Sequence, residues 1–158
     1  AFHPVYGEVE VGGYNPKFFS QNGPPEVLER WAGRQAMFNL YMSQSLPKIE
    51  ITGATVGTVR ASRDSATHEI RVTVRNTGRI PTALEQAKRV KIVRPDQVVA
   101  VMPAGSGTRI VGDVPDFHLA GGETRTVVLR IRAGSGDRRL TVRALSTRGG
   151  VAEREVTW

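Results

Sequence analysis

The chain of 158 residues contains no cysteine. Without thiols it can form neither a disulfide framework nor a cysteine-based metal site, and cysteine usage carries no information on the redox compartment. Long apolar runs are also missing, since no uncharged stretch reaches the roughly 18 residues that a membrane-spanning helix needs. The first residues lack the basic start and apolar core of a signal peptide, as a processed or excised chain also would. The length fits one medium-sized domain, or a smaller domain with an appendage.

Recognisable catalytic motifs are missing as well. The three histidines, His3, His68 and His118, occur in neither His-x-x-Glu nor His-x-x-x-His spacing, so a zinc ligand set is not predicted. Ser106 and Ser135 lie in Gly-Ser-Gly turns, but neither completes the Gly-x-Ser-x-Gly motif of a nucleophile elbow. Phosphate-binding loops, dinucleotide fingerprints and calcium loops are absent. We therefore expect no complete active site and no cofactor in this chain.

Aromatic residues are scarce after residue 47, where only Phe117 and Trp158 occur, whereas arginine accounts for eighteen of the twenty-two basic residues. Proteins that bind single-stranded nucleic acid stack bases on aromatic side chains, so this composition disfavours a nucleic-acid binder. The densest basic cluster, which we take as a candidate partner-facing site, comprises Lys88, Arg89, Lys91 and Arg94. A charged, solvated sheet face is the favoured interpretation of the other arginines, and an acidic polymer or partner surface is the alternative.

Charge divides the chain into two parts. Residues 1–47 hold three basic and four acidic residues, a net charge of −1, whereas residues 48–158 hold nineteen basic and eleven acidic residues, a net charge of +8. The two values sum to the +7 of the whole chain. We therefore predict a domain boundary near Pro47, with one unit over 1–47 and another over 48–158.

The first part contains an irregular aromatic segment and one amphipathic helix. The alternation of Glu8 to Val11 predicts a short strand, and a helix is predicted over 24–46, with Asn22 or Gly23 as its cap and Pro47 after its end. Its broad apolar stripe includes three residues that we expect to face a partner, namely Trp31, Phe38 and Met42.

From Lys48 onward the apolar residues alternate, as in strands with one buried face. The inward positions are predicted to be Ile70, Val72 and Val74, then Val127, Leu129 and Ile131, then Leu140, Val142 and Ala144. Further strands are predicted over 48–59, 88–95, 97–103, 108–114 and 150–158, with Gly-rich and Pro-rich turns between them. Seven or eight short strands predict an antiparallel, immunoglobulin- or fibronectin-like β-sandwich, so the fold class is mainly β.

Several unusual elements follow one another in the first 50 residues. These are a His-Pro pair at 3–4, the Gly-x-Val-Glu-x-Gly-Gly type of segment over 7–13, an Asn-x-Pro-Pro helix start over 22–25, and a Leu-Pro exit at 46–47. In this order they resemble the end of the catalytic domain of bacterial zinc metallocarboxypeptidases. The match covers about a third of the chain and departs from that pattern at Gly23, which is inserted before the proline pair. The segment from Ile49 resembles the β modules that often follow such domains.

This resemblance implies a secreted or periplasmic peptidase as the parent protein. Its zinc would be held by a His-x-x-Glu pair and a later His that this chain lacks, so the chain alone is expected to be inactive. Glu10 could hold the position of the general base, because it lies on the short strand before the last helix. The alternative is that Glu8 and Glu10 take part in structural or rim ion pairs.

Two hypotheses follow from these observations. The chain is either the C-terminal part of a zinc metallocarboxypeptidase-like protein, with a β-sandwich that supports folding or binds a partner, or a self-contained binding module for a carbohydrate, a peptide or a cell-envelope partner. In the first case we expect the helix to contact the missing catalytic domain or a second copy of itself. Membrane insertion and nucleic-acid binding are not expected in either case.

Overall fold

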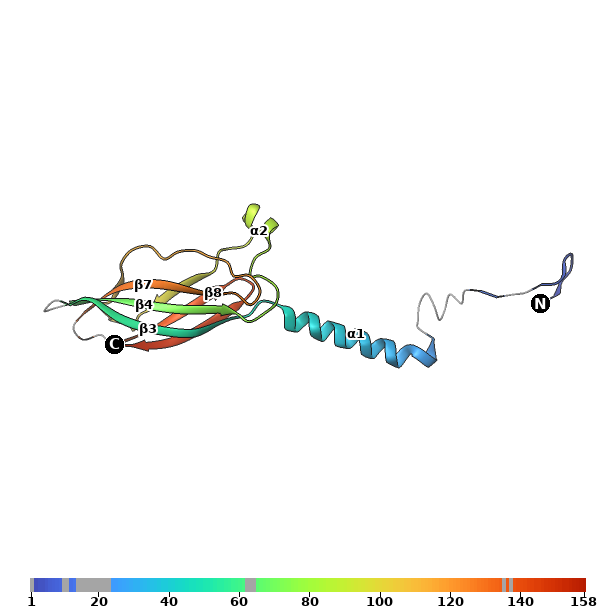
Figure 1. Cartoon of the computed structure of the whole chain (residues 1–158), viewed down its shortest axis with the longest axis horizontal. Helices are drawn as coiled ribbons and strands as arrows, with labels where there is room; N and C mark the ends of the chain where they lie inside the picture. Colours follow the sequence, from blue (N-terminus) through green and yellow to red (C-terminus); the bar gives the residue numbers. More distant parts are fainter. Residues whose placement is uncertain (1, 10–11, 14–23, 62–64, 135, 137) are drawn as a thin grey trace. The chain divides into compact units, whose positions relative to one another are not determined.

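We describe the protein from a computed structural model, which covers residues 2–9, 12–13, 24–61, 65–134, 136 and 138–158. The chain divides into two compact units, Ala1–Ser43 and Gln44–Trp158. Each unit is described below by itself. Figure 1 shows the strands of the second unit and the long helix that precedes them.

The first unit holds a small hairpin and most of a helix. Strand β1 (Phe2–His3) pairs antiparallel with β2 (Gly7–Glu8), and the ring nitrogen Nδ1 of His3 accepts hydrogen bonds from the backbone of the intervening turn. The predicted strand over 8–11 is therefore confirmed only at Glu8, because Val9 is not in a strand and residues 10–11 lie outside the described ranges. Helix α1 (Pro25–Ser45) agrees with the predicted helix, while its candidate caps also lie outside the described residues.

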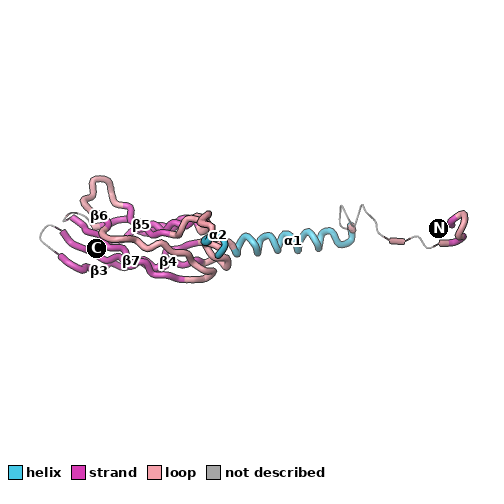
Figure 2. Tube along the Cα trace, turned by 90° about the horizontal axis from the view of Figure 1, so that it is seen from above, coloured by secondary structure: helices cyan, strands magenta, loops and turns pink. Residues whose placement is uncertain are grey.

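The second unit contains two antiparallel sheets. One sheet has the strand order β3-β4-β7-β6 and the other has the order β5-β8-β9. Both sheets appear in Figures 1 and 2. The bounds are β3 (Ile49–Ala61), β4 (Ser65–Asn76), β5 (Gln97–Val101), β6 (Arg109–Ile110), β7 (Thr124–Gly134), β8 (Arg139–Ser146) and β9 (Gly150–Thr157). Within the described ranges this gives seven strands, in agreement with the sequence-based expectation.

One apolar core joins the two sheets. All nine inward positions predicted from the alternation are buried, and they form a single cluster with residues that include Val98, Phe117, Leu119 and Val156. Because each strand turns every second side chain inward, two amphipathic sheets can bury these residues only against each other. The predicted mainly-β class and β-sandwich architecture are thus confirmed.

One predicted strand is wrong. Residues 88–95 alternate in sequence, but the structure places helix α2 (Glu85–Arg89) and a turn there. A strand over these residues would turn Val90 and Ile92 to one face, yet both are exposed, Ile92 by 73%. Instead Ala87 and Val93 are buried with Ala83 in a separate small cluster. The helix is further supported by an ion pair of 2.6 Å between Lys88 Nζ and Glu85 Oε1.

Strand β3 is irregular along its pairing with β4. Its register shifts between Ile51 and Gly53, and again between Thr58 and Arg60. At the second shift Thr58 pairs with His68, whereas Arg60 pairs with Thr67, so Val59 is an extra residue. Such a bulge changes the face to which the following side chains point.

The side-chain amide of Asn76 holds three segments together at the end of the sandwich nearest α1. Its Oδ1 accepts hydrogen bonds from the backbone N–H groups of Lys48 (3.1 Å) and Gly78 (3.0 Å). Its Nδ2 donates to the carbonyl oxygens of Ile80 (2.9 Å) and Ala120 (3.1 Å). Asn76 is fully buried, so these four bonds satisfy the whole hydrogen-bonding capacity of its amide.

The end of α1 is fixed to the same region. The carbonyl oxygen of Ser45 accepts hydrogen bonds from the N–H groups of Arg79 (3.1 Å) and Ile80 (3.0 Å). At Gly78 a Cβ atom would lie 2.0 Å from the carbonyl oxygen of Leu46, so only glycine allows this close approach. The Ser45 carbonyl, which as the last of the helix has no partner within it, thereby finds partners in the sandwich.

We expect Asn76→Ala to destabilise the protein strongly. The substitution leaves four backbone groups, one buried and three partly buried, without their partner, which should lower the free energy of unfolding by on the order of 3 kcal/mol. Urea unfolding measures this loss. Asn39→Ala is the matched control, because Asn39 is exposed on α1 and its side chain bonds only to that of Gln35; it should cost less than about 0.5 kcal/mol. Equal effects of the two substitutions would contradict this role.

Candidate functional site

The sandwich carries an apolar groove where the chain leaves α1. It has a volume of about 680 Å³ and is lined by Leu46, Pro47, Ile80, Pro81 and Leu84, with Arg79 and Arg148 as its polar members. Leu46 and Leu84 are both more than half exposed. We call this feature the helix-exit groove. A concave surface with apolar walls and few charges is typical of a binding site.

The groove is built from backbone that is already fixed. Gly78, Ser45 and Asn76 hold the Leu46–Pro47 segment against the loop over 78–81, as described above. Pro47 and Pro81 add prolines to the two sides of the groove, and each proline restricts its own backbone angle φ. The groove is therefore preformed, and a partner that binds there does not have to order its walls.

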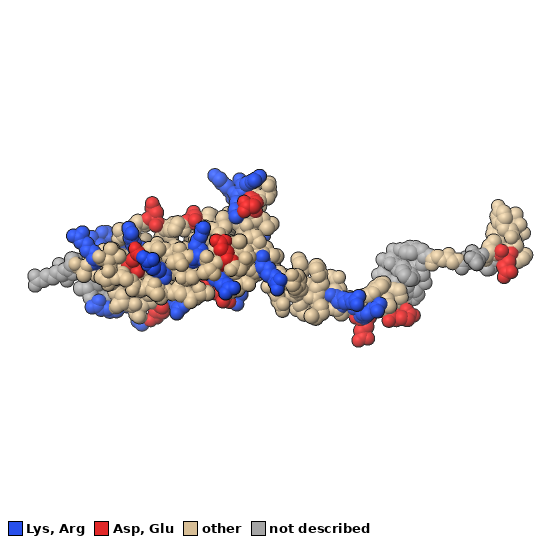
Figure 3. Space-filling view, viewed as in Figure 1, with Lys and Arg blue, Asp and Glu red and all other residues tan. Residues whose placement is uncertain are grey.

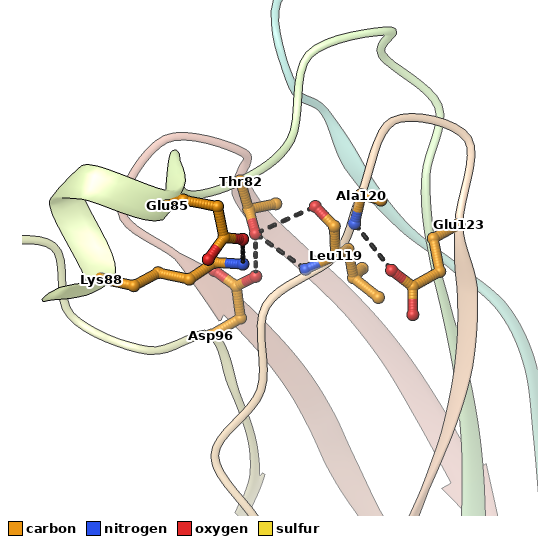
Figure 4. A network of polar contacts seen from close by, with 7 residues as sticks. All are labelled: Thr82, Glu85, Lys88, Asp96, Leu119, Ala120 and Glu123. Carbon is orange, nitrogen blue, oxygen red and sulfur yellow. Dashed lines mark hydrogen bonds and ion pairs between the residues drawn. The ribbon is translucent and has the colours of Figure 1, made fainter.

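A buried polar network fixes the wall that Pro81 and Leu84 belong to. Figure 4 shows Thr82 between Asp96 and Leu119. The hydroxyl of Thr82 donates to Asp96 Oδ2 (2.5 Å) and accepts a hydrogen bond from the backbone N–H of Leu119 (2.9 Å). Thr82 and Asp96 are both buried, and the bond from Thr82 satisfies one carboxylate oxygen of Asp96, whereas its Oδ1 is buried without a partner among the described residues. We assign this network a structural role, which could not be predicted from sequence because Asp96 lies between two predicted strands and 14 positions from Thr82.

Helix α1 displays large apolar side chains along its length. Trp31, Phe38 and Met42 are exposed by 46%, 55% and 46%. Of the residues of α1, all of which the structure describes, only Ser45 is buried. The three candidate partner-facing residues of the helix are thus accessible in this chain, and the apolar surface continues along the sequence into Leu46 and Pro47 of the groove.

The predicted basic cluster is only partly brought together. Lys88 and Arg89 lie on α2 and Lys91 follows it, close in sequence to Leu84 of the groove, and Figure 3 shows basic atoms gathered on this projecting segment. Lys88 is paired with Glu85. Arg94 instead lines a second cavity of about 380 Å³ together with Gln97 and Leu145.

The histidines are placed in three different settings. His3 belongs to the N-terminal hairpin, His68 is buried on β4, and His118 follows Phe117 in a loop of the core. In the described part of the chain, no three His, Asp or Glu residues come together in a way that could hold a metal ion. Glu10, the candidate general base, lies outside the described residues.

His68 packs against the last residue of the chain. Its ring centroid lies 5.2 Å from that of Trp158, and its Nδ1 is 3.3 Å from the hydroxyl of Thr58. Burial lowers the pKa of His68 below its ordinary value, and the positive charge of Arg138 lowers that pKa further. The neutral imidazole is therefore the form that the folded protein favours.

Comparison with known proteins identifies the second unit. Residues 48–157 match a family described as a domain of unknown function, DUF8731. The chain belongs to the DUF8731 family. The match spans both sheets of the sandwich, from Lys48 at the Asn76 anchor to Thr157 at the end of β9. No curated protein matches the chain. Among the described residues, no helix combines the length and the apolar character that crossing a lipid bilayer requires.

We expect the stability of the DUF8731 domain to fall in mild acid through His68. Its folded-state pKa is lowered, so the unfolded chain takes up the proton first, and stability is lost as pH falls below the unfolded value of about 6.5. His68→Gln removes this contribution. At pH 8 His68 is neutral, so urea unfolding there measures how much the substitution lowers the free energy of unfolding through lost packing. Between pH 8 and pH 5 the free energy of unfolding should then fall less for the variant than for the parent chain. Equal losses would contradict the assignment.

Proposed function

We propose that this chain is the C-terminal part of a zinc metallocarboxypeptidase-like protein. Residues 1–47 supply the last elements of its catalytic domain, and the DUF8731 sandwich is an accessory domain that supports folding or binds a partner. The chain alone has no complete active site. The observation that carries this proposal is the exposed apolar surface of α1, in a segment whose motifs occur in the order found in that family.

Helix α1 would be more stable if its apolar face packed against a partner surface. An isolated helix of 21 residues is only marginally stable in water, and most helices in proteins depend on packing of an apolar face. Trp31, Phe38 and Met42 leave about half of their surface in water. Burying what remains exposed of one such side chain yields roughly 1 kcal/mol, so a partner surface would stabilise the helix by several times that amount.

The helix-exit groove is the second apolar feature that supports a partner. It follows α1 without a break in sequence, and Lys88, Arg89 and Lys91 follow one of its walls. We place the catalytic domain of the parent protein against α1, the groove and this basic segment. The second hypothesis, a self-contained binding module, requires the apolar face of α1 to be buried within the 158 residues, and the exposure of Trp31, Phe38 and Met42 does not favour it.

Zinc enters this proposal only through the parent protein. The three histidines of this chain lie in different surroundings, and no described group of residues fits a zinc ion. The ligands would therefore come from the preceding part of the parent protein. Glu10 is our candidate for the general base of that protein; the alternative is that Glu8 and Glu10 take part in structural or rim ion pairs.

The coding sequence upstream of Ala1 tests the proposed parentage. We expect it to encode a His-x-x-Glu pair and a later His within about one domain length, since zinc hydrolases hold the ion with two or three such ligands. Sequencing the genomic region is sufficient. An upstream sequence without these ligands would exclude the peptidase and favour the binding module.

Leu84→Asp tests the groove. In this chain Leu84 is already half exposed, so the substitution should change the free energy of unfolding by less than about 0.5 kcal/mol. In the protein joined to its upstream part, the same substitution places a charge in the interface and should cost about 2 kcal/mol. Val59→Asp is the control, because Val59 is exposed on β3 and takes no part in the groove; it should be nearly neutral in both proteins. A neutral Leu84→Asp in the joined protein would place the catalytic domain elsewhere.

A further inference from the structure

Three arginines lie in one row across the four-stranded sheet. In the pairing register Arg60 of β3 is opposite Thr67 of β4, Thr67 is opposite Arg132 of β7, and Arg132 is opposite Arg109 of β6. Neighbouring strands lie about 4.8 Å apart, so the row crosses the sheet over roughly 14 Å. We call it the arginine row.

The row faces away from the core. His68 and Ile131, the next residues on their strands, are buried, so Thr67 and Arg132 point to the opposite face. Arg60 joins them only because of the bulge at Val59, which moves its partner from Ala66 to Thr67. If Val59 were instead paired with Thr67 in a regular ladder, Arg60 would lie opposite Ala66 and on the core side. The bulge thus serves to add a third cation to this face.

The arrangement is electrostatically unfavourable by itself. Like charges directly opposite each other in a sheet are destabilising, and Arg109 and Arg132 form such a pair. Among the residues that the structure describes, no carboxylate forms an ion pair with any arginine of the row. The neighbouring row is different, because Glu69 accepts ion pairs from Arg71 (2.6 Å) and Arg130 (3.7 Å). An anion bound at the arginine row would remove the repulsion.

The row also has a cavity with hydroxyl groups. The cavity has a volume of about 270 Å³ and is lined by Arg60, Ser65, Thr67 and Arg132. The Nε and Nη2 groups of Arg132 both donate to Ser65 Oγ at 3.2 Å, which holds the guanidinium in place. A planar guanidinium binds sulfate or carboxylate groups through two parallel hydrogen bonds, and the hydroxyls suit sugar oxygens.

We propose that the arginine row binds a linear acidic polysaccharide, whose sulfate or carboxylate groups pair with Arg60, Arg132 and Arg109 in turn. The repeated charges of such a polymer match cations that are spaced one and two strand separations apart. Nucleic acid fits less well, because single-strand binders need exposed aromatic side chains. The two aromatic residues after residue 47 are used elsewhere, Phe117 in the core and Trp158 against His68. This inference concerns the sandwich alone and goes beyond the proposed peptidase parentage.

The test is a titration of the 158-residue chain with dextran sulfate, with polygalacturonate, and with neutral dextran as the uncharged control. We expect binding of one or both charged polymers and none of neutral dextran. Arg109→Gln with Arg132→Gln should weaken that binding by about tenfold or more, since each lost charge-assisted hydrogen bond is equivalent to about a factor of ten. The double variant should unfold no earlier than the parent chain, because its repulsive pair is gone.

The matched control is Arg139→Gln with Arg154→Gln, which removes the same charge from two exposed positions on β8 and β9 of the other sheet. At an ionic strength that screens the long-range attraction between net charges, this control should change the affinity for the polymer by less than about twofold. If both double variants weakened polymer binding equally, the effect would be explained by net charge alone, and the proposal would be overturned. Tighter binding of single-stranded DNA with the same number of charges, or no binding of either charged polymer, would also overturn it.

Discussion

The geometry at the end of α1 and the shape of the helix-exit groove both depend on the hydrogen bonds of the buried Asn76 amide. It joins the residue before β3, the loop after β4 and the loop before β7, which meet beyond the ends of the β3–β4 and β4–β7 ladders. Because its donors and acceptors are all used, no small polar residue can replace it without leaving backbone groups unpaired. The close contact at Gly78 and the bonds to Ser45 follow from the same arrangement. The exit of α1 and the walls of the groove are thus fixed by one side chain.

The spacing of apolar residues along the sequence was sufficient to predict most of the secondary structure and the core. The period-two alternation identified β4, β7 and β8 and all nine of their inward residues, because burial of one sheet face leaves a direct mark on sequence. The apolar periodicity and prolines likewise identified α1 to within one residue at each end. The alternation of residues 88–95 led to the wrong prediction of a strand, because Val90 and Ile92 are apolar yet exposed. The five-residue helix α2 is also too short to show a helical period in the sequence.

The features that define the two surfaces depend on contacts between distant segments. Asn76 meets partners 28 and 44 positions away, and Thr82 meets Leu119 37 positions away, so neither role is visible in a local window. The arginine row requires the register of three strand pairs and the position of one bulge. In the sequence these arginines look like ordinary outward residues of a solvated sheet. Trp31, Phe38 and Met42 could be singled out because an amphipathic helix shows its stripe locally.

The extra residue in β3 sets a rule for how this domain can change in length. Loss of Val59 would bring Arg60 directly after Thr58 and leave it opposite Thr67, so the ladder would become regular and both faces of β3 would be kept. In β4, whose pairing with β7 has no register shift, loss of one residue would instead exchange the two faces of everything beyond it. Deletions should therefore be tolerated at the bulge of β3 and eliminated within β4. A single spare valine thus gives the edge strand a freedom in length that its neighbour in the sheet lacks.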